Sequence, residues 1–217
     1  MRRLILCSAI LMLSGCGLLS QPKPQSLTLY QLTPSQSSSA VAATAAAPGT
    51  APVCAQVLRV RGVEASPPFA GDSLLYSETP QVLGAFAWHR WATPPATMLT
   101  GDILDEVSAS GLYRAVLGPT DPGEADWALA IRINSGPLQI FSQGKGSSRT
   151  SSEQLSYTAT LANAGDGHVL GTRVFSASRA ADPTPYGGVQ ATNAIVAQLN
   201  GQLLTWLRQL SANADCK

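Results

Sequence analysis

Apolar and polar residues alternate along several short stretches of the chain, and this pattern predicts β-strands. The alternation is clearest in Leu27–Leu32 and Val53–Val63, which are also rich in residues that favour strands. Two hairpins are expected, one around Glu78–Pro80 and one around Asn163–Gly167. The remaining predicted strands are Ser73–Tyr76, Gln81–Phe86, Leu112–Leu117, Trp127–Ile133, Gln154–Leu161 and His168–Ser178.

Two other stretches repeat apolar residues at helical spacing. The first begins at Thr93-Pro94, with Thr as N-cap and Pro as first helical residue, and ends at Ser110-Gly111. The second, Val189–Leu210, carries a continuous apolar stripe. Acidic side chains of the first helix are predicted to lie on its solvent face: Asp102, Asp105 and Glu106. The order strands, helix, strands, helix predicts an α+β fold, with a mixed, mainly antiparallel sheet and two main helices packed on one face.

The first strand is flanked by two segments that lack the composition of a core. Residues 16–26 are polar, contain two prolines, and are predicted to form a flexible leader. Residues 33–52 consist mostly of Ser, Ala, Thr, Pro and Gly, with a single branched aliphatic residue, Val41. Such a tract cannot bury enough apolar surface to order itself, so we expect a disordered loop within one globular domain spanning 27–217.

The first fifteen residues read as a signal peptide, because two arginines precede a short apolar run that ends in small residues. Leu13-Ser14-Gly15-Cys16 resembles a bacterial lipobox, in which the cysteine becomes the lipidated first residue of the mature chain. The alternatives are an ordinary signal peptide or an uncleaved anchor helix. An anchor needs about 20 apolar residues, and the polar residues from Gln21 onward end the run too early. The resemblance also implies a location. An Asp after the lipidated cysteine retains such proteins at the inner membrane, and this chain has Gly17 there, which favours the periplasmic face of the outer membrane.

Charge and cysteine content indicate which ligands and which covalent links the protein can have. The chain has 14 basic and 13 acidic residues, and Arg2 and Arg3 would leave with the signal peptide, so the mature net charge is −1. This balance provides no basic surface for nucleic acid. Once Cys16 is lipidated, Cys54 and Cys216 are left as thiols in an oxidising compartment, where a disulfide is expected. The alternative is two buried free thiols.

Catalytic and metal-binding patterns are not found in the sequence. His89 and His168 lie outside metal or triad spacing, Cys54 has no neighbouring metal ligand, and the Gly144-Lys145-Gly146-Ser147 run lacks the remainder of a phosphate-binding loop. We therefore expect no enzyme, no cofactor and no metal site. Trp88 and Trp91 flank His89-Arg90 just before the first helix, and aromatic residues with Arg are common interface anchors. They are the candidate partner surface, the alternative being that both rings belong to the core.

An ordered set of short motifs resembles the ABC-type transport auxiliary lipoproteins, the PqiC-like family. The motifs are Leu29-Tyr30-Gln31-Leu32, Leu75-Tyr76, Trp91-Ala92-Thr93-Pro94-Pro95 with Met98-Leu99, Ala125-Asp126-Trp127-Ala128-Leu129, and Leu204-Thr205-Trp206-Leu207. The chain departs from the family pattern in the 33–52 tract and at Thr93, where an acidic residue is usual.

This resemblance implies a non-catalytic lipoprotein that accompanies an MCE-type ABC system moving lipids or other apolar molecules between the two membranes. Its partners would be the membrane, through the lipid anchor, and MCE-type subunits; a homo-oligomer is left open. The alternative is a structural envelope lipoprotein that assembles with itself or with other envelope proteins and has no transport role. A periplasmic hydrolase is a third reading, which the residue inventory disfavours.

Overall fold

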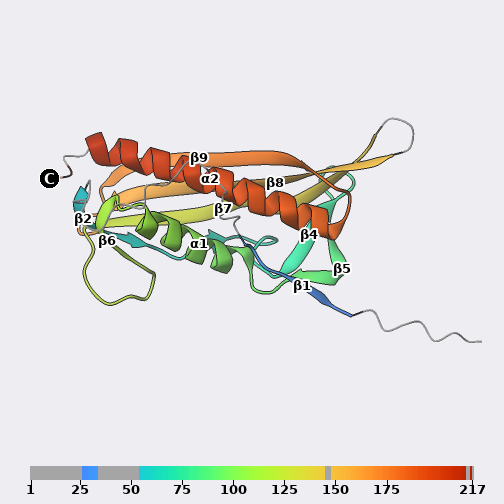
Figure 1. The fold of residues 1–217 in the computed structure, drawn as a ribbon, viewed down its shortest axis with the longest axis horizontal. Coiled ribbons are helices and arrows are strands. Elements are labelled where there is room, and N and C mark those ends of the chain that lie inside the picture. Colours follow the sequence, from blue (N-terminus) through green and yellow to red (C-terminus); the bar gives the residue numbers. More distant parts are fainter. Residues whose placement is uncertain (1–25, 34–53, 145–147, 214–215, 217) are drawn as a thin grey trace, which may run out of the picture.

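The computed structural model describes residues 26–33, 54–144, 148–213 and 216. Within them, nine strands form one mixed sheet and two helices lie on the same side of it (Figure 1). The longest ladders are antiparallel, as predicted, and the shorter ones are mostly parallel. The predicted signal peptide, the leader up to Gln25 and nearly all of the 33–52 tract lie outside the described residues.

Strand β7 (Trp127–Gln143) is the spine of the sheet. One of its edges pairs along almost its whole length with β8 (Arg149–Asn163), which pairs in turn with β9 (Val169–Ala181). The other edge of β7 pairs in succession with three strands. These are β2 (Cys54–Val60), β3 (Glu64–Ala65) and β4 (Ser73–Ser77).

Three more strands complete the sheet beyond β4 and beyond β2. Beside β4 lie the antiparallel β5 (Gly84–Trp91) and then the parallel β1 (Thr28–Tyr30). Beside β2 lies the parallel β6 (Tyr113–Leu117). Each predicted strand has a counterpart, but β5 begins at Gly84 and not at Gln81, β1 and β2 are shorter than predicted, and β7, β8 and β9 are longer.

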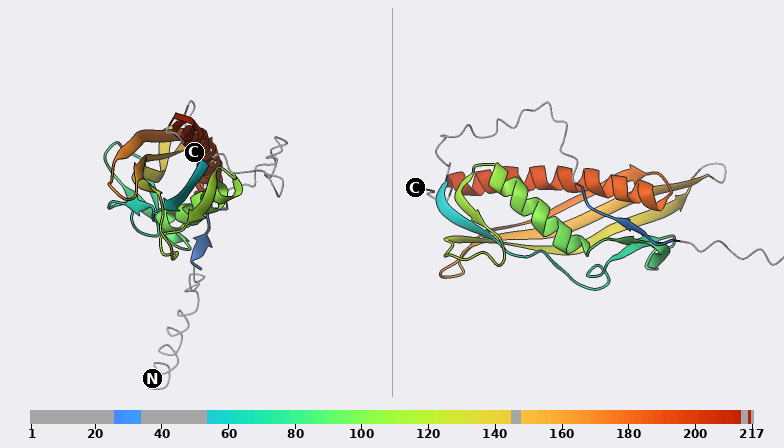
Figure 2. Two further views of the ribbon diagram at one scale, coloured as in Figure 1. Left: turned by 90° about the vertical axis from the view of Figure 1, so that its left-hand side faces the viewer. Right: turned by 60° about the horizontal axis from the view of Figure 1, so that its bottom comes forward.

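The core fills the space between the sheet and the helices α1 (Pro95–Ala109) and α2 (Pro185–Asn213). Alternate residues of β8 point inward, and the largest of these, Tyr157, donates a hydrogen bond from its hydroxyl to the Leu199 carbonyl oxygen of α2 at 3.2 Å. The Tyr157, Phe175 and Trp206 rings pack in series with centroid separations of 5.4 and 5.8 Å. The sheet twists around these two helices, as the view along the long axis shows (Figure 2).

Both helix starts differ from the sequence prediction. Helix α1 begins at Pro95 with Pro94 as N-cap and no side-chain cap, so Thr93 is not the capping residue that the sequence indicated. Its C-terminus agrees, with Ser110 as C-cap and Gly111 at a φ of 62°. Helix α2 begins four residues before Val189, and the Thr184 hydroxyl accepts a hydrogen bond from the Gly187 amide at 3.0 Å.

The molecule is elongated, and its two ends differ. We call one the β1 end: it contains the start of β1, the β4–β5 turn, the far end of the β7–β8 hairpin and the start of α2 (Figure 1). The opposite, disulfide end contains the start of β2, the β8–β9 turn and the end of α2. The chain thus enters the fold at one end and finishes at the other.

Candidate interaction surface

Strand β5 places the two predicted interface tryptophans in opposite environments. Trp91 is 3% exposed and belongs to the core, whereas Trp88 is 49% exposed. The prediction of a partner surface is therefore wrong for Trp91, because the end of β5 faces the core, where Trp91 lines a small cavity together with Leu74 and Val189. The alternative, that both rings are core, holds for Trp91 alone. Trp88 stays a candidate for contact with a partner.

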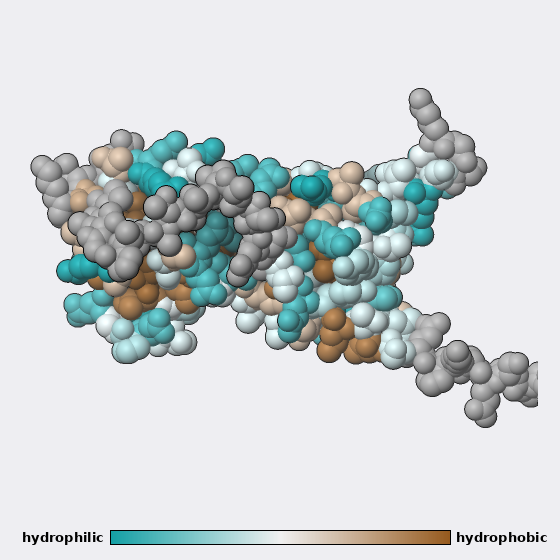
Figure 3. Space-filling model, viewed as in Figure 1, coloured by the Kyte–Doolittle hydropathy of each residue, from teal (hydrophilic) through white to brown (hydrophobic). Residues whose placement is uncertain are grey.

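Pairing with β1 surrounds Trp88 with further apolar side chains. The parallel register aligns Thr28 with His89 and Leu29 with Arg90, and side chains alternate between the faces of a strand. Leu27 and Leu29 therefore share the face of Trp88, and both leucines are exposed. We name Leu27, Leu29 and Trp88 the β1 patch. Hydrophobic surface is visible over this part of the molecule at the lower right of Figure 3.

The opposite face of the same ladder carries an aromatic cluster. The Tyr30 hydroxyl lies 3.1 Å from His89 Nδ1, and the two rings stack at a centroid distance of 5.8 Å. Tyr186, at the start of α2, lies 6.5 Å from the Tyr30 ring and is exposed. Burial, with the neighbouring Tyr186, raises the pKa of Tyr30. Tyr30 thus joins β1, β5 and α2, and His89 has a packing role beside it.

An open cleft of about 650 Å³ adjoins the β4–β5 turn at the β1 end. Leu83, Leu138 and Ile140 supply most of its apolar wall, and Gln154 is among its polar groups. A second cleft of about 450 Å³ shares Phe141 with it. There the Arg149 guanidinium lies 3.9 Å from the centre of the Phe141 ring and also pairs with Glu78. Volumes of this size suit small ligands or one chain segment.

A buried polar cluster, which no sequence pattern indicated, lies where α2 begins. Glu153 on β8 is 3% exposed, and burial raises its pKa to about 8 despite hydrogen bonds from Thr192 and the Leu138 backbone. Gln139 Nε2 donates to Ser151 Oγ at 2.9 Å and to the Asp182 carbonyl oxygen at 3.0 Å. Gly188 allows this approach, because a Cβ there would lie 2.8 Å from Gln139 Oε1. The carboxyl group is neutral around pH 7.

The acidic side chains of α1 do not all face solvent. Asp105 is exposed as predicted, but Asp102 and Glu106 are half-buried where α1 meets Asn200 of α2. Burial, with Asp105 and Glu106 nearby, raises the pKa of Asp102 to about 6, and burial also raises the pKa of Glu106. The prediction of a fully solvated acidic face is wrong for this pair, because α2 crosses over it. Burial therefore favours the protonated form of both carboxyl groups relative to exposed ones.

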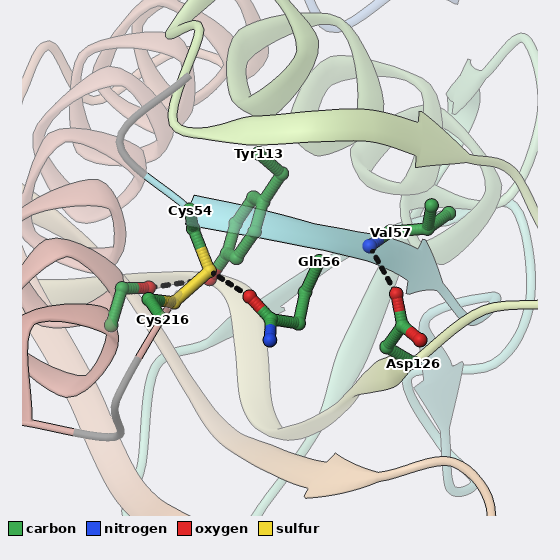
Figure 4. The surroundings of a disulfide bond; sticks show 7 residues. Cys54, Gln56, Val57, Tyr113, Asp126 and Cys216 are labelled. Atoms are coloured by element: carbon green, nitrogen blue, oxygen red, sulfur yellow. Dashed lines mark hydrogen bonds between the residues drawn. A yellow bond between two sulfur atoms is a disulfide. The ribbon is translucent and has the colours of Figure 1, made fainter. Parts of the chain in front are cut away.

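The cysteine pair predicted from the sequence is joined in the structure. Cys54 and Cys216 form a disulfide with their Cα atoms 4.7 Å apart, at the end of the molecule opposite the β1 patch (Figure 4). Tyr113 lies beside the bond, and its hydroxyl accepts a hydrogen bond from the Ser211 hydroxyl at 3.3 Å. Nearby, the Val57 amide donates to Asp126 Oδ2 at 2.7 Å. These contacts attach the end of α2 to β2 and β6.

The other residues considered from the sequence contribute no further site among the described residues. Cys16 lies outside the described residues. His168 is exposed in the β8–β9 turn, where its amide donates to Asp166 Oδ1 at 2.9 Å. Among the described residues, no three His, Cys, Asp or Glu side chains lie close enough to hold a metal ion. Neither described helix is apolar enough over a sufficient length to cross a membrane.

Comparisons with solved structures support the fold. A crystal structure of a protein from Xanthomonas campestris has a TM-score of 0.69 at 18% identity, covering 88% of this chain and 100% of that one. The crystal structure of an uncharacterized protein has a TM-score of 0.61 at 15% identity, covering 84% of this chain and 99% of that one. Identities this low indicate likeness of fold alone. A comparison with curated protein sequences found no match.

Sequence comparison identifies the family. The match spans residues 30–203, from the strand that carries the β1 patch to the last third of α2. It therefore includes strands β2 to β9, helix α1 and about two thirds of α2, but only the last residue of β1. The family is described as the ABC-type transport auxiliary lipoprotein component, which agrees with the resemblance drawn from the short motifs. The chain belongs to the family of ABC-type transport auxiliary lipoprotein components.

Proposed function

We propose that this protein is the non-catalytic, lipid-anchored auxiliary subunit of an MCE-type ABC system that moves lipids or other apolar molecules across the cell envelope. Residues 1–15 would be removed as the signal peptide, and lipidated Cys16 would hold the chain at the periplasmic face of the outer membrane. Residues 16–26 would form the leader, and residues 27–217 a single domain. The observation that most supports this proposal is the family match over 30–203, in a chain that also has a complete lipobox.

The position of β1 supports a role as a tethered adaptor. The domain begins at one end of its long axis, with ten residues between it and Cys16, and ten extended residues span at most about 35 Å. The domain would therefore stay close to the membrane that holds its anchor. The disulfide end would point away from that membrane, toward the periplasm. This arrangement leaves the far end of the domain free for contact with a transporter subunit.

Anchoring can be tested at Cys16. Cys16→Ala should accumulate as an unprocessed precursor that incorporates no labelled palmitate, because the cysteine sulfur is the acceptor. The matched control is Cys7→Ala, which removes a cysteine that lies within the predicted signal peptide. It should be processed and labelled like the wild type. Lipidation of the Cys16→Ala chain would show that the lipobox assignment is wrong.

Association with a transporter is tested separately. Photo-crosslinking groups at exposed Arg114 or Ala115 on β6, near the disulfide end, should capture an MCE-type subunit in intact cells. The same group at exposed Ser178 on β9, which lies on the other edge of the sheet, is the control. Mass spectrometry identifies the captured protein. Recovery of other envelope proteins with no MCE subunit would favour the structural lipoprotein instead.

A further inference from the structure

We propose that the β1 patch is a second membrane contact, which lies in the headgroup region of the same bilayer that holds the lipid anchor. This inference rests on the proposed lipidation of Cys16 and adds a direct contact between protein side chains and lipid. It makes the domain a peripheral membrane body with a fixed orientation. Without it, the domain would be free to rotate at the end of a flexible leader.

The side chains of the patch suit a membrane interface. Leu29 is 58% exposed, Leu27 is comparably exposed, and register places both on the face of Trp88. Tryptophan and tyrosine are favoured where hydrocarbon meets headgroups, and Leu extends the apolar contact inward. Tyr186 adds an exposed aromatic ring at the same end of the molecule.

The charges around the patch do not oppose this contact. Arg90, the register partner of Leu29, pairs with Asp72 at 3.2 Å. The pair presents no net charge to the bilayer, so the contact would not depend on anionic lipid. Binding driven by apolar burial should therefore be nearly insensitive to salt, unlike binding driven by surface charge.

The position of the patch favours a lipid bilayer as the surface that it contacts. Leu27 is the eleventh residue after Cys16, so the leader joins the fold directly at the patch. A flexible ten-residue segment has a root-mean-square length of roughly 20 Å. The anchor therefore holds these side chains at a high local concentration near the bilayer. A second, weak membrane signal beside a lipid chain strengthens attachment in the same way that paired anchors do.

Trp88 provides a direct optical test, because the other three tryptophans are buried: Trp91, Trp127 and Trp206. The lipidated mature chain is reconstituted in vesicles of phosphatidylethanolamine and phosphatidylglycerol that contain brominated phosphatidylcholine, a short-range quencher of tryptophan emission. We expect the emission to fall by at most the share of one tryptophan in four. Trp88→Phe should remove the quenching, and the Leu27→Ser/Leu29→Ser variant should reduce it by at least half.

The matched control is Val169→Ser, which changes an aliphatic side chain that is 52% exposed at the disulfide end. Its quenching should equal that of the wild type. Palmitate incorporation is measured on every sample. Lipidated protein whose Trp88 is not quenched would overturn the membrane contact and leave the anchor intact. A chain without palmitate would overturn the anchor as well. Crosslinking from position 88 to a second copy, with no quenching, would assign the patch to self-association and also overturn the proposal.

Discussion

The carboxyl group of Glu153 faces the core, where a charge is costly. The folded protein holds its proton up to about pH 8, whereas an ordinary glutamate loses it near 4.5. Between these values the unfolded chain binds fewer protons than the folded chain, so stability falls as the pH rises from about 4.5 to about 8 and then levels off. The half-buried Asp102 contributes in the same direction over a narrower range, since its pKa is about 6.

Glu153→Gln should flatten this dependence, because the amide keeps the shape of the acid and has no proton to lose. We expect a gain of about 2–4 kcal/mol over the wild type near pH 8, and a difference within about 1 kcal/mol near pH 5. Urea unfolding at several pH values measures both. Glu124→Gln, at an exposed position, is the control and should leave the slope unchanged. An unaltered slope for Glu153→Gln would show that the carboxyl group is already ionised at neutral pH.

Sequence patterns found some of the important single residues and missed others. Cys54 and Cys216 could be paired because few cysteines were left to combine, so counting was sufficient. Glu153 could not be found, because a carboxylate in an alternating strand normally marks the solvent face. Its burial depends on Gly188 letting α2 approach β8, which is a tertiary contact. Trp88 and Trp91 were predicted as one surface, but they lie three positions apart on β5, so the alternation of side chains places their rings on opposite faces.

Several strands and one helix extend further than their sequence patterns indicated, and β7 and α2 show why. Strand β7 runs past Ile133, the last residue of the predicted strand, to Gln143. The strand continues because its register against β8 shifts on either side of Ser135, and Gly136 adopts a φ of 84°. Helix α2 was predicted from Val189 by its apolar stripe, and it also includes the Gly187-Gly188 turn before that residue. Tertiary contact with Gln139 and Glu153 holds that glycine-rich turn in the helix.

Substitutions on the two faces of β5 should change the stability of the protein by different amounts. Trp91→Ala should destabilise the protein by about 3–5 kcal/mol, because a core ring leaves a cavity. That change corresponds to a drop in Tm of roughly 6–20 °C for a chain of this size. Trp88→Ala should shift the free energy of unfolding by less than about 1 kcal/mol, since its ring is largely exposed.

Circular dichroism during heating compares the two tryptophan variants directly. Trp88→Ala is the matched control, because it removes the same side chain from the same strand. Equal losses of stability would show that β5 packs as one unit and that Trp88 is not a free surface residue.

The disulfide acts on the molecule as a whole, because it joins residues 162 positions apart. Closing so long a loop restricts the unfolded chain, and the chain-entropy model gives at most about 5 kcal/mol. The Cys54→Ala/Cys216→Ala variant should therefore melt at a lower temperature, by an amount equivalent to about 2–5 kcal/mol. Reductant should lower the Tm of the wild type toward that of the variant and leave the variant unchanged. Alkylation of both thiols in unreduced, folded wild type would contradict the bond.

For the whole molecule, the sequence was sufficient to predict the class of fold and the order of its elements, because hydrophobic periodicity is a local property. The elongated shape and the separation of the two ends were not predictable, since they depend on β7 pairing with several strands in succession.

The disulfide also determines how the chain carries mechanical load. A pull on the chain that precedes β1 reaches the fold at that strand, which precedes Cys54 and so lies outside the covalent loop. A pull on the C-terminus arrives at Cys216 and crosses the sulfur–sulfur bond directly to Cys54. Tension between the two ends therefore bypasses the residues between the cysteines. The chain can lengthen only by releasing the three-residue β1 and the segment that follows it, while the rest of the sheet and both helices stay folded.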